Sequence, residues 1–382
     1  MDKGNNTALQ SGQKIIGGED DAFLSEQIIT YIGNKRALLV FIGEALDVVR
    51  KELKKEKIDL VDAFSGSGVV SRYFKQFSAN LFSNDLEAYC QTINRCYLTN
   101  KEDLDFEALH AHYDAITDKL ERLPLKKGFI SELYAPQNDA AIKENERVFF
   151  TCRNANYIDT CRQYLEDVPQ PYKGLLLAPL LYEASVHNNT SGVFKGFYKN
   201  SKTGIGQYGG NAQNALSRIK KEIKLPLPIF SNFNCAVHIL KEDAAKLPHI
   251  LPATDLVYLD PPYNQHPYGS NYFMLNLINS YQRPKNISRV SGIPKKWNRS
   301  RYNKKAESAE ALATLCNELK TKYLLISFNS EGFVSLDEMK KILKKQGKVT
   351  ILETKYNTFR GSRNLRGRNP YVKEYLYLVK KY

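Results

Sequence analysis

The chain has 382 residues, of which 42% are hydrophobic, enough for one large domain or two smaller ones, and its net charge of +14 favours a polyanionic partner. No apolar run approaches the roughly 20 residues that span a bilayer, and the first residues, MDKGNNTALQSGQK, lack the apolar stretch of a signal peptide, so we expect a cytoplasmic protein without a membrane partner. The six cysteines contain no C-x-x-C pair, which argues against a zinc site or a disulfide framework, and no metal ligand is expected.

Seven apolar, β-branched runs bounded by turn residues are typical of strands. They begin at Ile58, Asn80, Cys235, Asp255, Tyr323, Lys348 and Glu374. Most are nearly continuous in apolar residues, as strands buried on both faces are. Helical patterns alternate with them at 38–53, 69–77, 306–319 and from Ser335, where Ser335 and Glu338 form a capping-box pattern and Gly347 is expected to end the helix. The alternation predicts an α/β doubly wound, mostly parallel sheet whose last two strands form an antiparallel edge.

A long, mainly helical segment separates the second strand from the third. It covers residues 101–234, and a connection of that length in a compact domain needs structure of its own. We therefore expect an inserted domain at 101–234, a core domain formed by 26–100 and 235–382, and a flexible N-terminal arm at 1–25.

The first predicted strand runs into the sequence VDAFSGSGVV. Phe64 precedes Gly66 and Gly68, and glycines at this point let the backbone approach a bound molecule near a helix N-terminus. The third glycine of a dinucleotide fingerprint and the Lys-Ser/Thr of a P-loop do not follow. A ligand without phosphates therefore fits this loop better than a nucleotide.

Acidic residues follow the next two strands. Asp85 lies 17 residues after Gly68, about where an acid at the end of the second strand reaches ribose hydroxyls in this topology. Asp243 follows the third strand in the same way. Either could instead be an ordinary turn or N-cap residue; together with the glycine loop, Asp85 favours a nucleoside-type cofactor.

The fourth strand ends in the tetrad Asp260, Pro261, Pro262 and Tyr263. In a sheet whose order reverses at the first strand, strands one and four are neighbours, so the tetrad and the glycine loop are expected to meet at one crevice. A carboxylate and proline-flanked carbonyls accept hydrogen bonds from an amino group, and a tyrosine ring offers a face on which a base can stack. The alternative is a structural Asp-Pro-Pro turn with a core tyrosine.

Two segments carry most of the basic excess. Residues 281–305 contain nine basic residues and no acid, and residues 341–373 contain ten basic residues and one acid. Each is interleaved with aromatic residues, a combination that favours nucleic acid over a merely solvated face. Lys195 and Lys199 lie in a Gly-rich loop that is as readily an ordinary exposed loop as a phosphate contact. The candidate nucleic-acid contacts are Lys295, Lys296, Arg299, Arg301, Lys195 and Lys199.

With these residues in place, the chain resembles the adenine-specific (6-amino) DNA methyltransferase family, in the motif order of its α subgroup. The resemblance rests on five motifs that occur in the family's order and on two later stretches, LLISFNSEGF and YNTFRGSRNLRGRNPYVKEYLYLV, so it covers most of the chain outside the insertion. It assigns cofactor binding to Tyr31, Gly33 and Lys35 in YIGNKRALL, to Phe64, Gly66 and Gly68, and to Asp85 and Asp243, and catalysis to Asp260, Pro261, Pro262 and Tyr263.

The resemblance implies a Rossmann-like methyltransferase core, S-adenosylmethionine as methyl donor and double-stranded DNA as substrate, with the target adenine flipped out of the helix. It makes 101–234 the target-recognition domain and a cognate restriction endonuclease a possible partner. The donor is already activated, so neither a histidine nor a metal is expected in catalysis. An RNA adenine methyltransferase, an inactive nucleic-acid-binding protein and a cytosine-amino methyltransferase are the alternatives; the last group tends to carry serine where this chain has Asp260.

Overall fold

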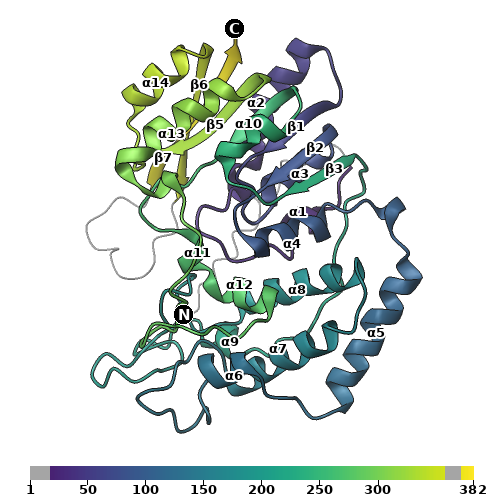
Figure 1. The fold of residues 1–382 in the computed structure, drawn as a ribbon, viewed down its shortest axis with the longest axis vertical. Helices are drawn as coiled ribbons and strands as arrows, with labels where there is room; N and C mark the ends of the chain where they lie inside the picture. Colours follow the sequence, from purple (N-terminus) through teal and green to yellow (C-terminus); the bar gives the residue numbers. More distant parts are fainter. Residues whose placement is uncertain (1–17, 358–370) are drawn as a thin grey trace.

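The computed structural model describes residues 18–357 and 371–382, and a seven-stranded sheet forms one half of it (Figure 1). The strands follow the order β3-β2-β1-β4-β5-β7-β6; β1 to β5 are parallel, and β7 lies antiparallel between β5 and β6. The predicted mostly parallel sheet with an antiparallel edge pair is therefore confirmed. The strands are β1 (Ile58–Asp62), β2 (Ser78–Asn84), β3 (Ala236–Leu240), β4 (Thr254–Leu259), β5 (Thr321–Asn329), β6 (Gly347–Asn357) and β7 (Tyr371–Lys381).

Helices cover both faces of the sheet. Along β4, Leu256 and Tyr258 point into one buried cluster while Val257 and Leu259 point into the other, which explains why the strand is apolar throughout. The first cluster is covered by α2 (Leu39–Leu53), α3 (Val69–Lys75) and α4 (Ala88–Tyr97). The second is covered by α10 (Leu247–Ile250), α13 (Lys305–Glu318) and α14 (Leu336–Lys344).

The helix predicted at 69–77 ends at Lys75, and the helix that begins after Ser335 ends before the glycine expected to terminate it. Ser335 caps α14 as expected, since its side chain accepts a hydrogen bond from the Glu338 N–H. The prediction that Gly347 ends this helix is wrong, because the helix ends at Lys344 and Gly347 is the first residue of β6. A Cβ at that position would collide with the Lys380 carbonyl of β7, so the glycine permits close strand pairing.

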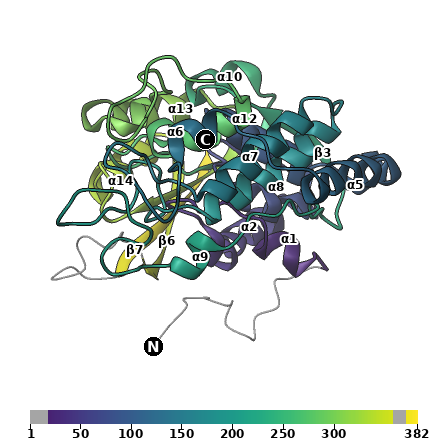
Figure 2. The same cartoon turned by 90° about the horizontal axis from the view of Figure 1, so that it is seen from below.

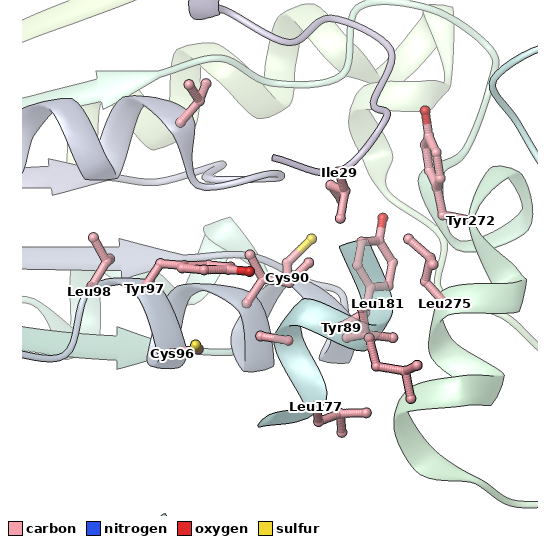
Figure 3. Close-up of a cluster of buried hydrophobic side chains, with 14 of the residues drawn as sticks. Ile29, Tyr89, Cys90, Cys96, Tyr97, Leu98, Leu177, Leu181, Tyr272 and Leu275 are labelled. Atoms are coloured by element: carbon pink, nitrogen blue, oxygen red, sulfur yellow. The ribbon is translucent and has the colours of Figure 1, made fainter. Parts of the chain in front are cut away.

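The segment between β2 and β3 is mainly helical and packs against the sheet half. Leu177 and Leu181 of the inserted segment lie against Tyr89 of α4 and Leu275 (Figure 3), and all four belong to one continuous buried cluster. Seen from below, α6, α7 and α8 lie in the middle of the molecule and α5 at one side (Figure 2). The inserted helices are α5 (Phe106–Arg122), α6 (Phe129–Tyr134), α7 (Cys152–Leu165), α8 (Tyr172–Val186) and α9 (Leu216–Lys220).

The chain after β4 connects the two halves. It forms α11 (Tyr268–Asn271) and α12 (Phe273–Ser280), and α12 packs between α4 and α8. Short 3-10 helices precede or follow these elements: η1 (Arg36–Leu38), η2 (Lys101–Asp103), η3 (Ala244–Lys246) and η4 (Arg301–Asn303).

The N-terminal segment is attached to the core earlier than predicted. Residues 1–17 of the expected arm lie outside the described residues, but α1 (Asp21–Ser25) is ordered and Phe23 is fully buried. The buried Arg72 guanidinium donates hydrogen bonds to the carbonyls of Phe23, Glu26 and Gln27 at 2.9 Å each. The predicted end of the flexible arm at residue 25 is therefore wrong, because the chain is already packed against the core at Phe23.

Candidate functional site

A pocket of about 870 Å³ opens where the carboxyl ends of four neighbouring strands meet. The order β3-β2-β1-β4 places the loops after these strands side by side, as the predicted strand reversal at β1 requires. Among the predicted site residues, the pocket is lined by Tyr31, Gly33, Lys35, Phe64, Gly66, Asp85, Asp243, Asp260 and Pro262. Gly68, Pro261 and Tyr263 lie beside the pocket and are not among its lining residues.

The glycine loop takes a conformation that requires its glycines. Gly66 and Gly68 have φ values of +50° and +78°, in the left-handed region. A Cβ on Gly66 would lie 2.7 Å from the Tyr31 ring. The Gly66 N–H donates a hydrogen bond to Asp85 Oδ2 at 2.9 Å, so the predicted acid of β2 also fixes this loop.

A second acid accompanies Asp85, and the sequence analysis missed it. Asp85 Oδ1 accepts a hydrogen bond from the Glu87 N–H at 2.9 Å, and Glu87 itself lines the pocket while being only 2% exposed. Burial raises the pKa of Glu87 to about 7, although the hydrogen bond from Asn276 of α12 opposes this effect. The sequence feature that could have identified Glu87 is its position two residues after Asp85.

The last residue of β1, Asp62, is a further acid that the analysis missed. Its Oδ2 accepts a hydrogen bond from Ser71 Oγ at 2.7 Å, whereas its buried Oδ1 has no hydrogen-bond partner within the described parts of the chain. Burial raises its pKa to about 7. Asp62 was interpreted only as part of an apolar strand, yet an acid directly before a glycine loop was a usable signal.

The opposite wall of the pocket combines the third predicted acid with aromatic rings. Asp243 caps η3 by accepting a hydrogen bond from the Ala245 N–H at 3.0 Å. Phe64 meets the ring of Tyr302 edge to face, with 5.1 Å between ring centroids. Tyr302 belongs to the basic segment 281–305, so that segment contributes to the pocket as well as to the surface.

The carboxylate of the tetrad lies beside a buried cation. Lys35 Nζ is 3.3 Å from Asp260 Oδ1 and 2.8 Å from Oε1 of Glu374 on β7. Burial raises the pKa of Asp260 to about 6, Lys35 lowers it and Glu374 raises it. For Lys35, burial alone would lower the pKa, but Asp260 and Glu374 outweigh burial and leave it well above 10.5.

Aromatic side chains surround the tetrad. Tyr31 stacks on Tyr268 and on Tyr272, with centroid distances of 4.8 and 4.7 Å, and the latter two rings lie 5.9 Å apart, so the three form one aromatic cluster. The Tyr263 ring meets Phe328 at 5.6 Å, and Lys35 Nζ lies 5.5 Å from its centroid. The tetrad tyrosine therefore lies next to the motif that begins at Tyr31, through Lys35 and Gly33.

The predicted DNA contacts divide into two groups. Lys195, Lys199, Lys295, Lys296 and Arg299 have exposed side chains. Arg301 is also exposed, but its guanidinium lies within 3.5 Å of Glu307 and Glu310 on α13. Part of the second basic segment, residues 358–370 with four of its ten basic residues, lies outside the described residues.

Neither a metal site nor a membrane-spanning helix is found among the described residues. They contain no group of three or more His, Cys, Asp or Glu side chains arranged to hold a metal ion. Across residues 18–357 and 371–382, no helix combines the length and the apolar character needed to cross a membrane.

Known proteins with similar sequences point to one family. A model of the family described as D12 class N6 adenine-specific DNA methyltransferase matches residues 31–342. The chain is 28% identical to the Type II methyltransferase M.NlaIII of Neisseria lactamica over 365 residues, covering 92% of this chain and 99% of that protein. It is 28% identical to the Type II methyltransferase M.CviAII of Paramecium bursaria Chlorella virus 1 over 359 residues, covering 92% and 98%.

The similarity extends to a longer relative. The chain is 28% identical to the Type II methyltransferase M.FokI of Planomicrobium okeanokoites over 325 residues, which covers 83% of this chain and 47% of that protein. The family match spans the motif at Tyr31, the glycine loop, the insertion and the tetrad, in the order in which the sequence presents them. The chain therefore belongs to the family of D12 class N6 adenine-specific DNA methyltransferases.

Proposed function

We propose that this chain uses S-adenosylmethionine to methylate the 6-amino group of an adenine flipped out of double-stranded DNA. The observation that carries the proposal is the shared pocket: Gly66 in the loop after β1 and Asp260 after β4 line the same cavity, although 194 positions separate them. One part of the cavity offers acceptors for a nucleoside-type cofactor, and the other offers an acceptor for an amine.

The residues at the β1 and β2 ends suit the methyl donor. Asp62 Oδ1, buried and without a protein partner in the described residues, is an acceptor for the donor's ammonium group. Asp85 and Glu87 retain lone pairs for ribose hydroxyls, since each carboxylate oxygen can accept more than one hydrogen bond. When bound, the donor supplies a methyl group that is already activated on a sulfonium.

The adenine base of the donor would occupy the wall formed by Phe64, Tyr302 and Asp243. The two rings provide apolar surface, and the carboxylate of Asp243 can accept from an exocyclic amine. We keep Tyr31, Gly33, Phe64, Gly66, Gly68, Asp85 and Asp243 as proposed cofactor residues, and we add Asp62, Glu87 and Tyr302. Lys35, which lines the same pocket, we assign instead to the carboxylate of the tetrad that its ammonium contacts.

The tetrad holds the target amine. Asp260, ionised above about pH 6, and the Pro261 carbonyl accept its hydrogens, while Tyr263 provides the face on which the flipped base stacks. Pro262 restricts the backbone that presents these acceptors. Catalysis is then mainly positioning, together with electrostatic support for the positive charge that develops on the amine nitrogen.

DNA recognition is proposed to lie with the insertion at 101–234, together with the basic segment 281–305. Arg147 of the insertion donates hydrogen bonds to the carbonyls of Ser288 and Arg289, and Tyr134 donates one to the Gly292 carbonyl, so the two regions are physically joined. Lys195 Nζ lies 3.3 Å from Nδ1 of His266, three residues beyond the tetrad. The exposed lysines and Arg299 can therefore contact phosphates on either side of the pocket.

We further propose that the enzyme is the modification half of a restriction–modification system. The relatives named as Type II methyltransferases support this assignment, and a cognate endonuclease that reads the same site would be its functional partner. Methylation-sensitive sequencing of DNA from cells that express the enzyme would reveal the protected sequence.

The test uses labelled S-adenosylmethionine, duplex DNA and nucleoside analysis. We expect label in 6-methyladenine; in Asp260→Ala, transfer should be lost while the donor still binds. Asp47→Asn is the matched control, because it removes one partly exposed carboxylate on α2 away from the pocket. Label only in RNA, label in methylcytosine, or full activity of Asp260→Ala would each contradict the proposal.

A further inference from the structure

A buried charge network lies beside the tetrad, and one of its members, Glu374, was assigned no role by the sequence motifs. Lys35 has a side chain only 4% exposed and lies between two carboxylates, Asp260 at 3.3 Å and Glu374 at 2.8 Å. The Glu374 side chain is 1% exposed, so its charge is almost completely removed from water. A buried carboxylate this close to a catalytic group is costly unless it is paired and hydrogen-bonded, as it is here.

The sheet topology explains why Glu374 is at this position. Because β7 runs antiparallel to β5, its first residues lie beside the carboxyl end of β5, and Glu374 pairs with Asn329 in the ladder. The carboxyl end of β5 neighbours that of β4, which Asp260 follows. Glu374 Oε1 also accepts a hydrogen bond from Ser327 Oγ at 2.8 Å, which fixes the carboxylate on the Lys35 side.

We propose that Glu374 is a positioning residue for methyl transfer: it holds the Lys35 ammonium, so that Asp260 remains available as an acceptor for the target amine. This inference rests on the proposed function of the tetrad. Lys35 makes its hydrogen bond to Glu374, whereas its contact with Asp260 is the longer one and leaves Oδ1 without a hydrogen bond among the described residues. Without the Glu374 charge, the ammonium would shift to Asp260 and compete with the substrate.

The network also sets the charge at the reacting amine. Lys35 and Asp260 alone would form a neutral pair, whereas Glu374 gives the three groups a net charge of about −1 at neutral pH. Methyl transfer places positive charge on the amine nitrogen, and a net negative environment stabilises that charge as it develops. Neutralising Glu374 should therefore slow the chemical step and leave the cofactor acids at the β1 and β2 ends untouched.

The pH dependence of the reaction separates this role from a structural one. The titratable groups that face Asp260 are Lys35, Glu374, Asp62, Tyr258, Tyr263 and Tyr268. Burial raises the Asp260 pKa and the Glu374 charge raises it further, while Lys35 lowers it. Removing the Glu374 charge must lower the Asp260 pKa, so the acidic limb of the rate profile moves to lower pH. A simple loss of folded enzyme would reduce the plateau without moving the limb in that direction.

The experiment compares Glu374→Gln with Glu353→Gln in the full chain. The first variant keeps an oxygen that can accept from Ser327 and Lys35; the second removes an exposed carboxylate on β6, paired with Lys373, as a matched control. Single-turnover transfer from labelled S-adenosylmethionine to duplex DNA is measured between about pH 5 and 9. We expect Glu374→Gln to lose about tenfold to hundredfold in rate at high pH, corresponding to about 1.4–2.8 kcal/mol, with its acidic limb at lower pH and donor affinity within about twofold.

The inference would be overturned if Glu374→Gln showed the same dependence of rate on pH as the wild type. It would also be overturned if the variant were slower but its acidic limb stayed at the wild-type pH. Glu374→Asp keeps the charge but draws the carboxylate away from Lys35, so a several-fold loss is expected; an unchanged rate, or a loss as large as that of Glu374→Gln, would also overturn it. This variant decides the question if Glu374→Gln does not fold. If the wild-type enzyme transfers no methyl to DNA, the proposed function fails; an active wild-type enzyme with an indifferent Glu374 refutes only the positioning role.

Discussion

Replacing Asp62 by Asn should stabilise the protein and at the same time weaken binding of the methyl donor. Burial raises the pKa of Asp62 from 3.8 to about 7, the hydrogen bond from Ser71 opposes this, and Asp260 and Asp85 add to it. Because the folded-state pKa is the higher one, the folded protein binds the proton more tightly than the unfolded chain. The stability that this provides is complete below about pH 4 and is lost as the pH rises to about 7.

The effect on the free energy of unfolding follows from the difference between the folded and unfolded pKa values, at about 1.4 kcal/mol for each pKa unit. Relative to an uncharged side chain, Asp62 costs the folded state about 2 kcal/mol at pH 5.5, where it must hold a proton, and about 4 kcal/mol at pH 8, where its charge is buried. The advantage of Asp62→Asn should therefore double between these pH values. An asparagine Oδ1 can still accept the Ser71 hydroxyl, which limits any loss of packing.

Urea unfolding of the wild type, Asp62→Asn and the control Asp47→Asn at both pH values measures this difference. Calorimetric titration with S-adenosylmethionine should show at least a tenfold weaker affinity for Asp62→Asn, because the amide that keeps its oxygen on Ser71 turns an NH2 donor towards the position where the proposal places a cation. A variant that is less stable than wild type at both pH values, or equally changed at both, would refute the burial argument. Unchanged donor affinity would refute the assigned contact.

Further predictions concern the loop, the tetrad and the surface. Gly66→Ala should lower donor affinity more than tenfold in the same titration without changing the far-UV spectrum, because its φ of +50° and the Tyr31 ring leave no place for a Cβ. The transfer rate should fall as pH drops below about 6, where Asp260 becomes protonated and loses an acceptor; a limb near pH 4 in single-turnover assays would contradict this. Lys296→Ala should weaken binding to cognate and unrelated duplexes alike and reduce the salt slope by about one, as measured by fluorescence anisotropy. Arg301→Ala should change affinity less, since two carboxylates of α13 already pair with its guanidinium.

The sequence was sufficient to predict the sheet because its central strands are buried on both faces and therefore nearly continuous in apolar residues, as in β4. The outer strand β3 is more exposed, and its signal was a β-branched run bounded by turn residues. The strand reversal at β1 then followed from general rules for doubly wound sheets and correctly placed Gly66 and Asp260 at one pocket. The error at Gly347 had a local cause: a glycine needed for close approach to Lys380 was interpreted as a helix terminator.

The parts of the site that escaped prediction depend on contacts between distant residues. Asp62 is the last residue of β1, and its place before the glycine loop was its one local signal; its burial and its unpaired oxygen identify it as an acceptor. Arg301 looked like any other cation of its segment until its neighbours on α13 were known. Glu374 is 339 positions from Lys35, and nothing in the sequence predicted that a carboxylate on the last strand would reach the first motif.

The position of β7 connects these observations. A seventh strand added in parallel would present its final residues at the pocket edge, whereas the antiparallel strand presents its first residues there and brings Glu374 to Lys35. Because β7 lies between β5 and β6, the outer edge of the sheet is one strand farther from the pocket. The parallel strands already present Asp62, Asp85 and Asp260 at the pocket. The antiparallel pair therefore does more than close the sheet, because it supplies a further buried negative charge, Glu374, to the cation beside Asp260.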